Sequence, residues 1–254
     1  MKHSKKIITA LVCIVALLAV TVAGTIAYLT DEDTVVNTFT VGKVDITLNE
    51  APVDEDGKAI TGDNVERVKA NEYHLIPGME YDKDPTITVK AGSENAYVRM
   101  MMTVYNASAV QAIIDNEAHG LEDYADLFSG WDETTWLYQG FIQDTDADTS
   151  TFEFRYKEVI NGYNEETDAA EDMNLEPLFT KLIAPGTLTS DELASLYGDE
   201  TDTEDDFMIE IVGHAVQADS FADSTDAETG ETITAEDAAW AAFDGQMKEG
   251  SVNE

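Results

Sequence analysis

The amino-acid sequence predicts a mainly β protein, a β-sandwich with short helices in the connections and at the C-terminus. Short segments that alternate apolar and polar residues recur along the chain with turn residues between them, which is the pattern of half-buried strands. We count about seven to nine such segments. They do not alternate regularly with long helical patterns, which argues against a parallel α/β sheet. No internal repeat is visible.

The first 27 residues predict an export signal. Lys2, Lys5 and Lys6 precede an uncharged run from Ile7 to Thr30, and small residues lie near the end of that run. A basic head followed by an apolar middle is typical of a secretory signal peptide. The part of the chain that follows is then expected to work outside the cytoplasm.

We place the signal peptidase cut between Ala27 and Tyr28, and a cut after Ala23 is the alternative. An uncleaved membrane anchor is a further alternative, since the uncharged run is long enough for a bilayer core of about 30 Å. Its strongly apolar part is short for that purpose, which favours cleavage. Residues 28–254 are then one domain.

The charge balance is strongly acidic. The chain has 14 Lys and Arg residues against 52 Asp and Glu residues. Three of the lysines lie in the predicted signal, so cleavage leaves a formal charge of −41. Such a field repels nucleic acid and anionic lipid, and we expect neither as a partner. Contact with the membrane is expected only through the signal peptide.

The single cysteine, Cys13, lies in the apolar part of the signal. The mature chain therefore has no disulfide, and its stability must come from core packing and strand pairing. An exported protein without cysteine is typical of a bacterial exterior rather than of a eukaryotic secretory pathway.

The N-terminal half predicts strands separated by turns. Val35 to Leu48 predicts one or two strands, Thr86 to Lys90 a clean alternating strand, and Ala96 to Tyr105 a central strand that is apolar on both faces. Turns are expected at Asp56-Gly57 and at Pro77-Gly78.

The middle of the chain predicts mixed structure. Ser108 can cap a short helix through Asn116. An apolar patch at helical spacing follows, formed by Tyr124, Leu127, Phe128 and Trp131. Two strands are expected next, at 136–142 and 151–160.

A tight hairpin is expected at Asn161-Gly162. The segments 163–174 and 199–206 are acidic and polar, and we expect both to be solvated loops. Phe207 to Gln217 predicts the last strong strand, with a bulge at Gly213.

Two helices are predicted from their caps. Thr189 and Glu192 form a capping box that opens a helix to about Tyr197. Thr234 and Asp237 open a terminal helix, which Gly245 is expected to close. Trp240 and Phe243 share one face of that helix.

Several stretches resemble the TasA/camelysin family of exported proteins. They are GTIAYLTDEDTVVNTFTVGKVDITL (24–48), LIPGMEYDKDPTITVKAGSENAYVRM (75–100), EPLFTKL (176–182) and the strand ending in HAVQAD (214–219). The likeness covers the N-terminal third well, the C-terminal third moderately, and residues 107–174 poorly. It implies a jelly-roll-like sandwich, processing by a SipW-type signal peptidase, and secretion to the matrix or surface of a Gram-positive bacterium.

Members of that family polymerise by donor-strand exchange, and the resemblance implies self-association into fibres or with related matrix subunits. Residues 28–41 would be the donor segment, with Val35, Val36, Phe39 and Val41 as its anchors. The segment is extended and β-branched, which suits strand addition to an exposed sheet edge. The alternative is that it pairs within its own sheet.

An enzyme is an alternative to this structural role, because the camelysin name carries a claim of metalloprotease activity. The mature chain has only His74, His119 and His214, and none of them stands in an HExxH motif. We therefore expect no catalytic residues and no enzyme. A secreted metalloprotease and a monomeric surface adhesin are the alternatives to a fibre subunit.

No cofactor is expected, apart from one candidate calcium site. Asp144, Asp146 and Asp148 alternate as in a calcium loop, but Thr149 replaces the glycine and Arg155 the bidentate glutamate of an EF-hand. The three aspartates are therefore candidate ligands outside an EF-hand.

Overall fold

The computed structural model describes residues 30–34, 37–39, 44–164, 168–197, 207–226 and 229–251. For 30–34, 37–39, 164 and 247–251 it describes the backbone alone. The export signal, the cut between Ala27 and Tyr28, the anchors Val35, Val36 and Val41, and the acidic segment 199–206 lie outside these residues.

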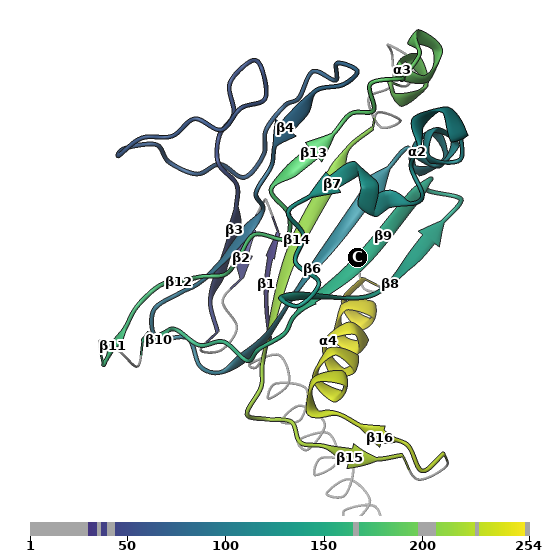
Figure 1. The fold of residues 1–254 in the computed structure, drawn as a ribbon. Coiled ribbons are helices and arrows are strands. Elements are labelled where there is room, and N and C mark those ends of the chain that lie inside the picture. The colour runs from purple at the N-terminus through teal and green to yellow at the C-terminus, as the bar shows by residue number, and fades with distance from the viewer. Residues whose placement is uncertain are drawn as a thin grey trace, which may run out of the picture.

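The largest sheet is antiparallel and has six strands in the order β2-β1-β14-β6-β9-β8 (Figure 1). Its strands are β1 (Thr30–Thr34), β2 (Asn37–Phe39), β6 (Ala96–Tyr105), β8 (Trp136–Asp144), β9 (Thr149–Tyr156) and β14 (Ile209–Gln217). The longest ladder joins β6 to β14 from Ala96–Gln217 to Val104–Ile209. β6 is the buried central strand that the sequence predicts.

Two three-stranded sheets, in the orders β12-β5-β3 and β4-β13-β7, form the second layer. Their strands are β3 (Ile46–Asn49), β4 (Glu80–Asp82), β5 (Thr86–Val89), β7 (Phe128–Ser129), β12 (Met173–Asn174) and β13 (Lys181–Ile183). Side chains of both layers share one buried cluster, among them Ile46, Ile87, Leu182 and Met100. The predicted mainly β sandwich is confirmed.

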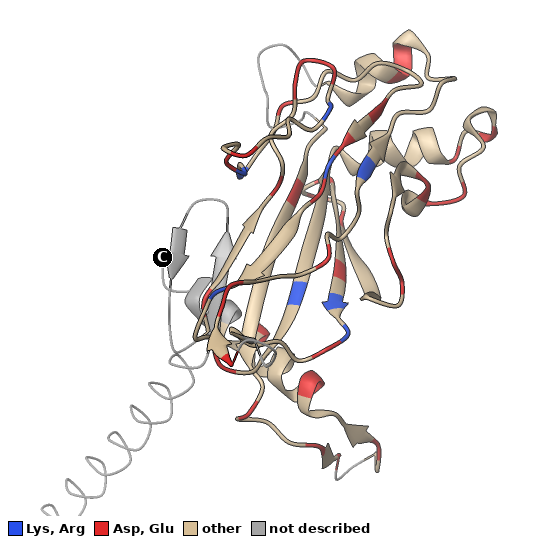
Figure 2. Cartoon of the chain, turned by 60° about the vertical axis from the view of Figure 1, so that its left-hand side comes forward, with Lys and Arg blue, Asp and Glu red and all other residues tan. Residues whose placement is uncertain are grey.

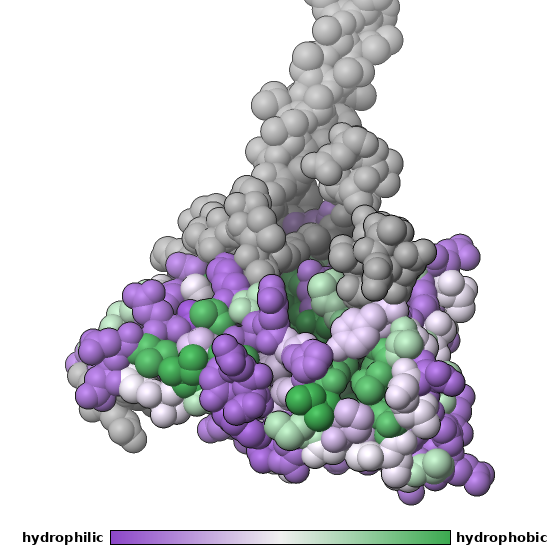
Figure 3. Space-filling model, turned by 90° about the horizontal axis from the view of Figure 1, so that it is seen from above, coloured by the Kyte–Doolittle hydropathy of each residue, from purple (hydrophilic) through white to green (hydrophobic). Residues whose placement is uncertain are grey.

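Short elements complete the fold. They are α2 (Ala107–Ile114), the 3-10 turns η1 (Glu117–His119) and η2 (Tyr124–Leu127), α3 (Ser190–Leu196), α4 (Ala235–Ser251), and the small hairpins β10 (Tyr163–Asn164) with β11 (Ala169–Ala170) and β15 (Ser224–Thr225) with β16 (Thr232–Ile233). The end of the sandwich that carries α2 and α3 shows apolar patches among hydrophilic side chains (Figure 3).

The predicted capping box at Thr189 and the predicted cap at Thr234 are both at the expected helix starts. The Thr189 side chain accepts from the amide of Glu192, and the Glu192 carboxylate accepts from the amide of Thr189 at 2.8 Å. At α4, the amide of Asp237 donates to Thr234 Oγ1 at 3.1 Å. The expected end at Gly245 is wrong, because α4 runs on to Ser251. A glycine on an exposed helix face lowers helix propensity without ending the helix.

The predicted bulge at Gly213 is wrong. The β14–β6 register runs without a shift, and Gly213 lies opposite Met100. A Cβ at Gly213 would come within 2.9 Å of Ile87 Cδ1, so this position lets the two layers approach closely. The bulge of the large sheet lies in β8 instead, where the register shifts between Tyr138 and Gly140.

The Asn161-Gly162 hairpin is also wrong. Gly162 donates to the Ser93 carbonyl at 3.0 Å and accepts from the Gly92 amide at 2.9 Å, so it joins two turns that are far apart in sequence. The predicted loop 163–174 is wrong in part, since Met173 and Asn174 form β12 and pair with β5. The Thr88 hydroxyl donates to Asn174 Oδ1 at 2.7 Å, which satisfies a polar pair at that position.

Candidate functional site: the N-terminal strands and the edge of β14

The N-terminal strands extend the large sheet beyond β14. β1 pairs antiparallel with β14, from Thr30–Val216 to Asp33–Gly213, and β2 pairs back onto β1. Of the four predicted anchors, Phe39 alone is in a described strand, the end of β2. In the single chain, the described parts of the segment, 30–34 and 37–39, pair within their own sheet.

β14 is covered on both faces beside β1. Ala215 belongs to the core between the layers, while Val216 packs with Trp240 and Phe243 of α4 on the opposite face. Both Ala215 and Val216 are fully buried. An added strand can therefore reach β14 only along its edge, through main-chain hydrogen bonds.

A buried arginine holds α4 on the outer face of this sheet. Arg99 of β6 donates to His214 Nδ1 at 3.1 Å and forms an ion pair with Asp244 of α4. Its guanidinium lies 4.5 Å from the Trp240 ring centre and 5.3 Å from that of Phe243. The sequence signal for this site is a lone arginine in the apolar run 96–105 and an aspartate on the apolar side of the terminal helix.

A second ion pair repeats the pattern at the start of α4. Arg155 of β9 donates to Asp237 at 2.7 Å and to Glu153 at 2.8 Å. The pKa of Asp237 is lowered, first by the hydrogen bond from Arg155 and then by that from Thr234. Two basic residues of the sheet thus face two acidic residues of α4, although basic residues are few in this protein (Figure 2).

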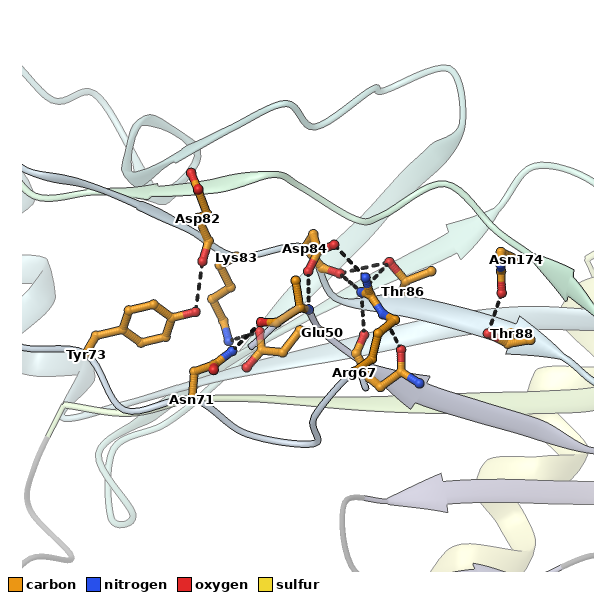
Figure 4. A network of polar contacts seen from close by, with 12 residues as sticks. Glu50, Arg67, Asn71, Tyr73, Asp82, Lys83, Asp84, Thr86, Thr88 and Asn174 are labelled. Carbon is orange, nitrogen blue, oxygen red and sulfur yellow. Dashed lines mark hydrogen bonds and ion pairs between the residues drawn. The ribbon is translucent and has the colours of Figure 1, made fainter. Parts of the chain in front are cut away.

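A polar network holds the segment 50–73 against residues 82–86, where β4 ends and β5 begins (Figure 4). Lys83 and Glu50 form an ion pair at 2.8 Å whose side chains are 10% and 6% exposed. Arg67 bonds Asp84 at 2.9 Å and also reaches Asn49 and Thr86. The Lys83 and Arg67 side chains thus each bond a carboxylate of the same network, which ties these segments together.

The calcium candidates are engaged in local structure. Asp144 Oδ1 accepts from the amides of Asp146 and Ala147 in the β8–β9 turn. Asp148 accepts from the amide and the hydroxyl of Ser108, both at 2.8 Å, and so caps α2. The predicted cap by Ser108 is wrong, because the N-cap residue is Asn106 and the capping carboxylate comes from Asp148 in the β8–β9 turn.

The histidines lie in separate settings. His119 bonds Thr187 at 2.6 Å and Glu192 at 2.9 Å, whereas His214 contacts Arg99 under α4. The pKa of Glu192 is lowered to about 2, first by the Thr189 amide and then by His119 and Asn116. Within the described part of the chain, no group of three or more His, Cys, Asp or Glu residues could hold a metal ion.

Comparisons of the chain with protein-family models, with curated proteins and with solved structures found no match in any of the three. None of the described helices has both the length and the apolar character needed to cross a membrane.

Proposed function

We propose that this protein is a secreted structural subunit of TasA type, which assembles at a cell surface or in an extracellular matrix by donor-strand exchange. The observation that supports it most directly is the position of β1. This strand comes from the first residues after the predicted cut, and it pairs with β14, whose two faces are already covered.

The pairing of β1 is short compared with that of its neighbour. The described β1–β14 ladder covers residues 213–216 of β14, whereas the β6–β14 ladder covers 209–217. With about 1 kcal/mol net for each main-chain hydrogen bond, releasing β1 costs a few kcal/mol. That is less than the 5–15 kcal/mol of a typical whole domain, so β1 can leave while the sandwich stays folded.

Exchange between subunits replaces the β1–β14 contacts within one subunit with equivalent β1–β14 contacts between two subunits. A β1 strand that leaves its own sheet exposes the edge of β14, and the β1 strand of a second subunit fits that edge in the same register. The net cost is small in such a swap, and a chain of swaps that does not close makes a fibre. The acidic surface keeps free subunits soluble until the strand is exchanged.

A cysteine pair tests the proposal, since the chain from Tyr28 on has no cysteine of its own. Asp31 lies opposite Ala215, and directly opposed residues in antiparallel strands are close enough for a disulfide. In the variant Asp31→Cys/Ala215→Cys, oxidation before assembly locks β1 in its own sheet. We expect that locked protein to form no fibres by negative-stain microscopy.

Oxidation after assembly gives the second readout. In exchanged subunits the same two cysteines belong to different chains, so a non-reducing gel shows a ladder of linked subunits. The matched control is Asp33→Cys/Thr38→Cys, which joins β1 to β2 within one segment. It should give single chains in both states. Locked protein that assembles like the wild type would refute the proposal.

Deletion of 28–40 adds a test of the segment itself, and we expect the shortened protein to form no fibres. If wild-type protein stays a single particle at high concentration in size-exclusion chromatography, the monomeric adhesin is the better reading. The protease alternative predicts casein cleavage that a chelator abolishes, and we expect no cleavage.

A further inference from the structure

The inner face of the large sheet is not fully covered at the end opposite β1. Phe152 and Phe154 of β9 face the core and are each 7% exposed. Their cross-strand neighbours in β8, Phe141 and Tyr138, are 58% and 45% exposed. The second layer therefore stops short of the edge strand, and two large aromatic side chains of the inner face meet solvent.

A groove of about 510 Å³ lies between these strands and the segment around η2. Tyr124, Phe128 and Trp131 form its other wall. The rings lie close together: Tyr124 is 5.0 Å from Phe152, and Trp131 is 5.4 Å from Phe154 between ring centres. Three of the four residues of the predicted apolar patch thus line the groove, and the fourth, Leu127, is buried in the core.

The rim of the groove is acidic. Glu122, Asp123 and Glu133 are exposed lining residues, and no Lys, Arg or His lines the groove. An aromatic face attracts a cation, and neighbouring carboxylates add to that attraction. The occupant expected at this rim is therefore basic, and a second copy of this chain offers few basic residues, with 14 Lys and Arg against 52 Asp and Glu.

The edge of β8 is open to strand addition. Within the described residues β8 pairs with β9 alone and is the last strand of its sheet. Its sequence, WLYQGFIQD, has no lysine or proline, the residues that commonly protect an edge. On the outer face Leu137 is 40% exposed and Ile142 72% exposed, so apolar surface is available on both sides of the strand.

We propose that β8 and the aromatic groove bind an extended basic segment of a partner protein. The segment adds as a strand along β8, and its alternate side chains, lysine or arginine, enter the groove between the rings and the carboxylates. The intervening apolar side chains cover Leu137 and Ile142. This site is at the opposite end of the sheet from β1, so it does not depend on the proposed assembly.

The test uses the secreted protein and an alternating Lys-Val octapeptide with blocked ends. Trp131 reports binding by fluorescence, because Trp136 and Trp240 are buried at 0% and 1% exposure. We expect saturable binding that weakens with salt, and binding at least about tenfold weaker for the matching Glu-Val peptide. Methylation of alternate peptide nitrogens, which removes strand pairing, should abolish binding.

Two variants of equal charge change separate the groove from the overall field. Glu122→Gln/Asp123→Asn/Glu133→Gln neutralises the rim and should weaken Lys-Val binding about tenfold, since each exposed carboxylate contributes up to about 1 kcal/mol. Asparagine at 123 still caps η2. The control Glu55→Gln/Asp63→Asn/Glu66→Gln changes the distant segment 50–73 and should leave the affinity within about twofold.

Hydrogen exchange gives an independent readout, since amides 137–144 should be protected when the Lys-Val peptide is bound. The proposal is overturned if that peptide does not bind, if both triple variants weaken it equally, or if the methylated peptide binds as tightly. It is also overturned if a neutral oligosaccharide quenches Trp131 and the peptide does not, because the groove would then be a sugar site.

Discussion

Replacing Gly162 with alanine is expected to destabilise the protein by about 3 kcal/mol. A Cβ at this position would lie 1.9 Å from the carbonyl oxygen of Lys90 and 2.7 Å from the amide nitrogens of Gly92 and Ser93. All three are backbone atoms, so no change of side-chain rotamer relieves the overlap. The turn at 90–93 and the chain at Gly162 must therefore move apart by more than about 1 Å, so that the added Cβ reaches a normal van der Waals distance from these atoms.

The magnitude follows from the bonds that this movement breaks. Gly162 exchanges hydrogen bonds of 2.9 and 3.0 Å with Gly92 and Ser93 and accepts a third, of 3.2 Å, from Glu171. Loss of the two shorter bonds costs about 2 kcal/mol, and the strain of overpacking adds about 1 kcal/mol or more. For a domain of this size, 3 kcal/mol corresponds to a fall in Tm of about 6–12 °C.

Urea unfolding followed by circular dichroism and tryptophan fluorescence measures this change. Gly245→Ala is the matched control, because it adds the same methyl group on α4 with no atom within 4 Å. That variant should gain up to about 1 kcal/mol from helix propensity. A loss below about 0.5 kcal/mol in Gly162→Ala would show that the two turns are not in the contact described here.

Three further predictions concern single carboxylates. Asp148→Ala should lower the free energy of unfolding by about 2 kcal/mol, because the cap of α2 is lost and alanine must adopt a left-handed φ of 48°. Asp148→Asn should retain most of the stability. Calcium or a chelator should not shift the Tm of the wild type. The lowered pKa of Glu192 means that its contribution is present above pH 4.5, the ordinary value, and is lost as pH falls toward 2. Glu192→Gln should therefore show a flatter stability curve than the wild type in that window, while Asp191→Asn should follow the wild type; parallel curves for Glu192→Gln would contradict the assignment. Asp244→Ala should destabilise by about 2–3 kcal/mol, since the buried Arg99 guanidinium keeps only Glu153 at 3.6 Å as an ionic partner; a redshift of Trp240 fluorescence before global unfolding would mark release of α4, and a change below about 0.5 kcal/mol would contradict this role of the ion pair.

Interactions between residues close in sequence could be predicted without the structure. The capping box at Thr189 and the cap at Thr234 join residues three positions apart, so the chain needs only a helical turn to form them. The alternation in 86–90 and the apolar run 96–105 predicted β5 and β6 correctly. A strand buried on one face alternates apolar and polar residues, and a strand buried on both faces is apolar throughout.

The candidate sites were harder to predict from the sequence. The donor segment was located from the predicted cut and the resemblance, but its partner strand, β14, lies about 180 residues further along the chain, and nothing local encodes the register. The aromatic groove appeared in the sequence only as four residues at helical spacing. Its other wall comes from β8 and β9, and its opening depends on where the second layer ends.

By itself, the sequence determined the fold class, the central strand, the starts of α3 and α4 and the acidic character of the surface, since each depends on local pattern or on composition. Tertiary structure alone decided the role of Gly162, Gly213 and Asp148, because each meets atoms from distant segments. A glycine that permits close approach and a glycine that permits a turn or a bulge look the same in a sequence. An aspartate that caps a helix from a distant turn likewise looks like one in a calcium loop.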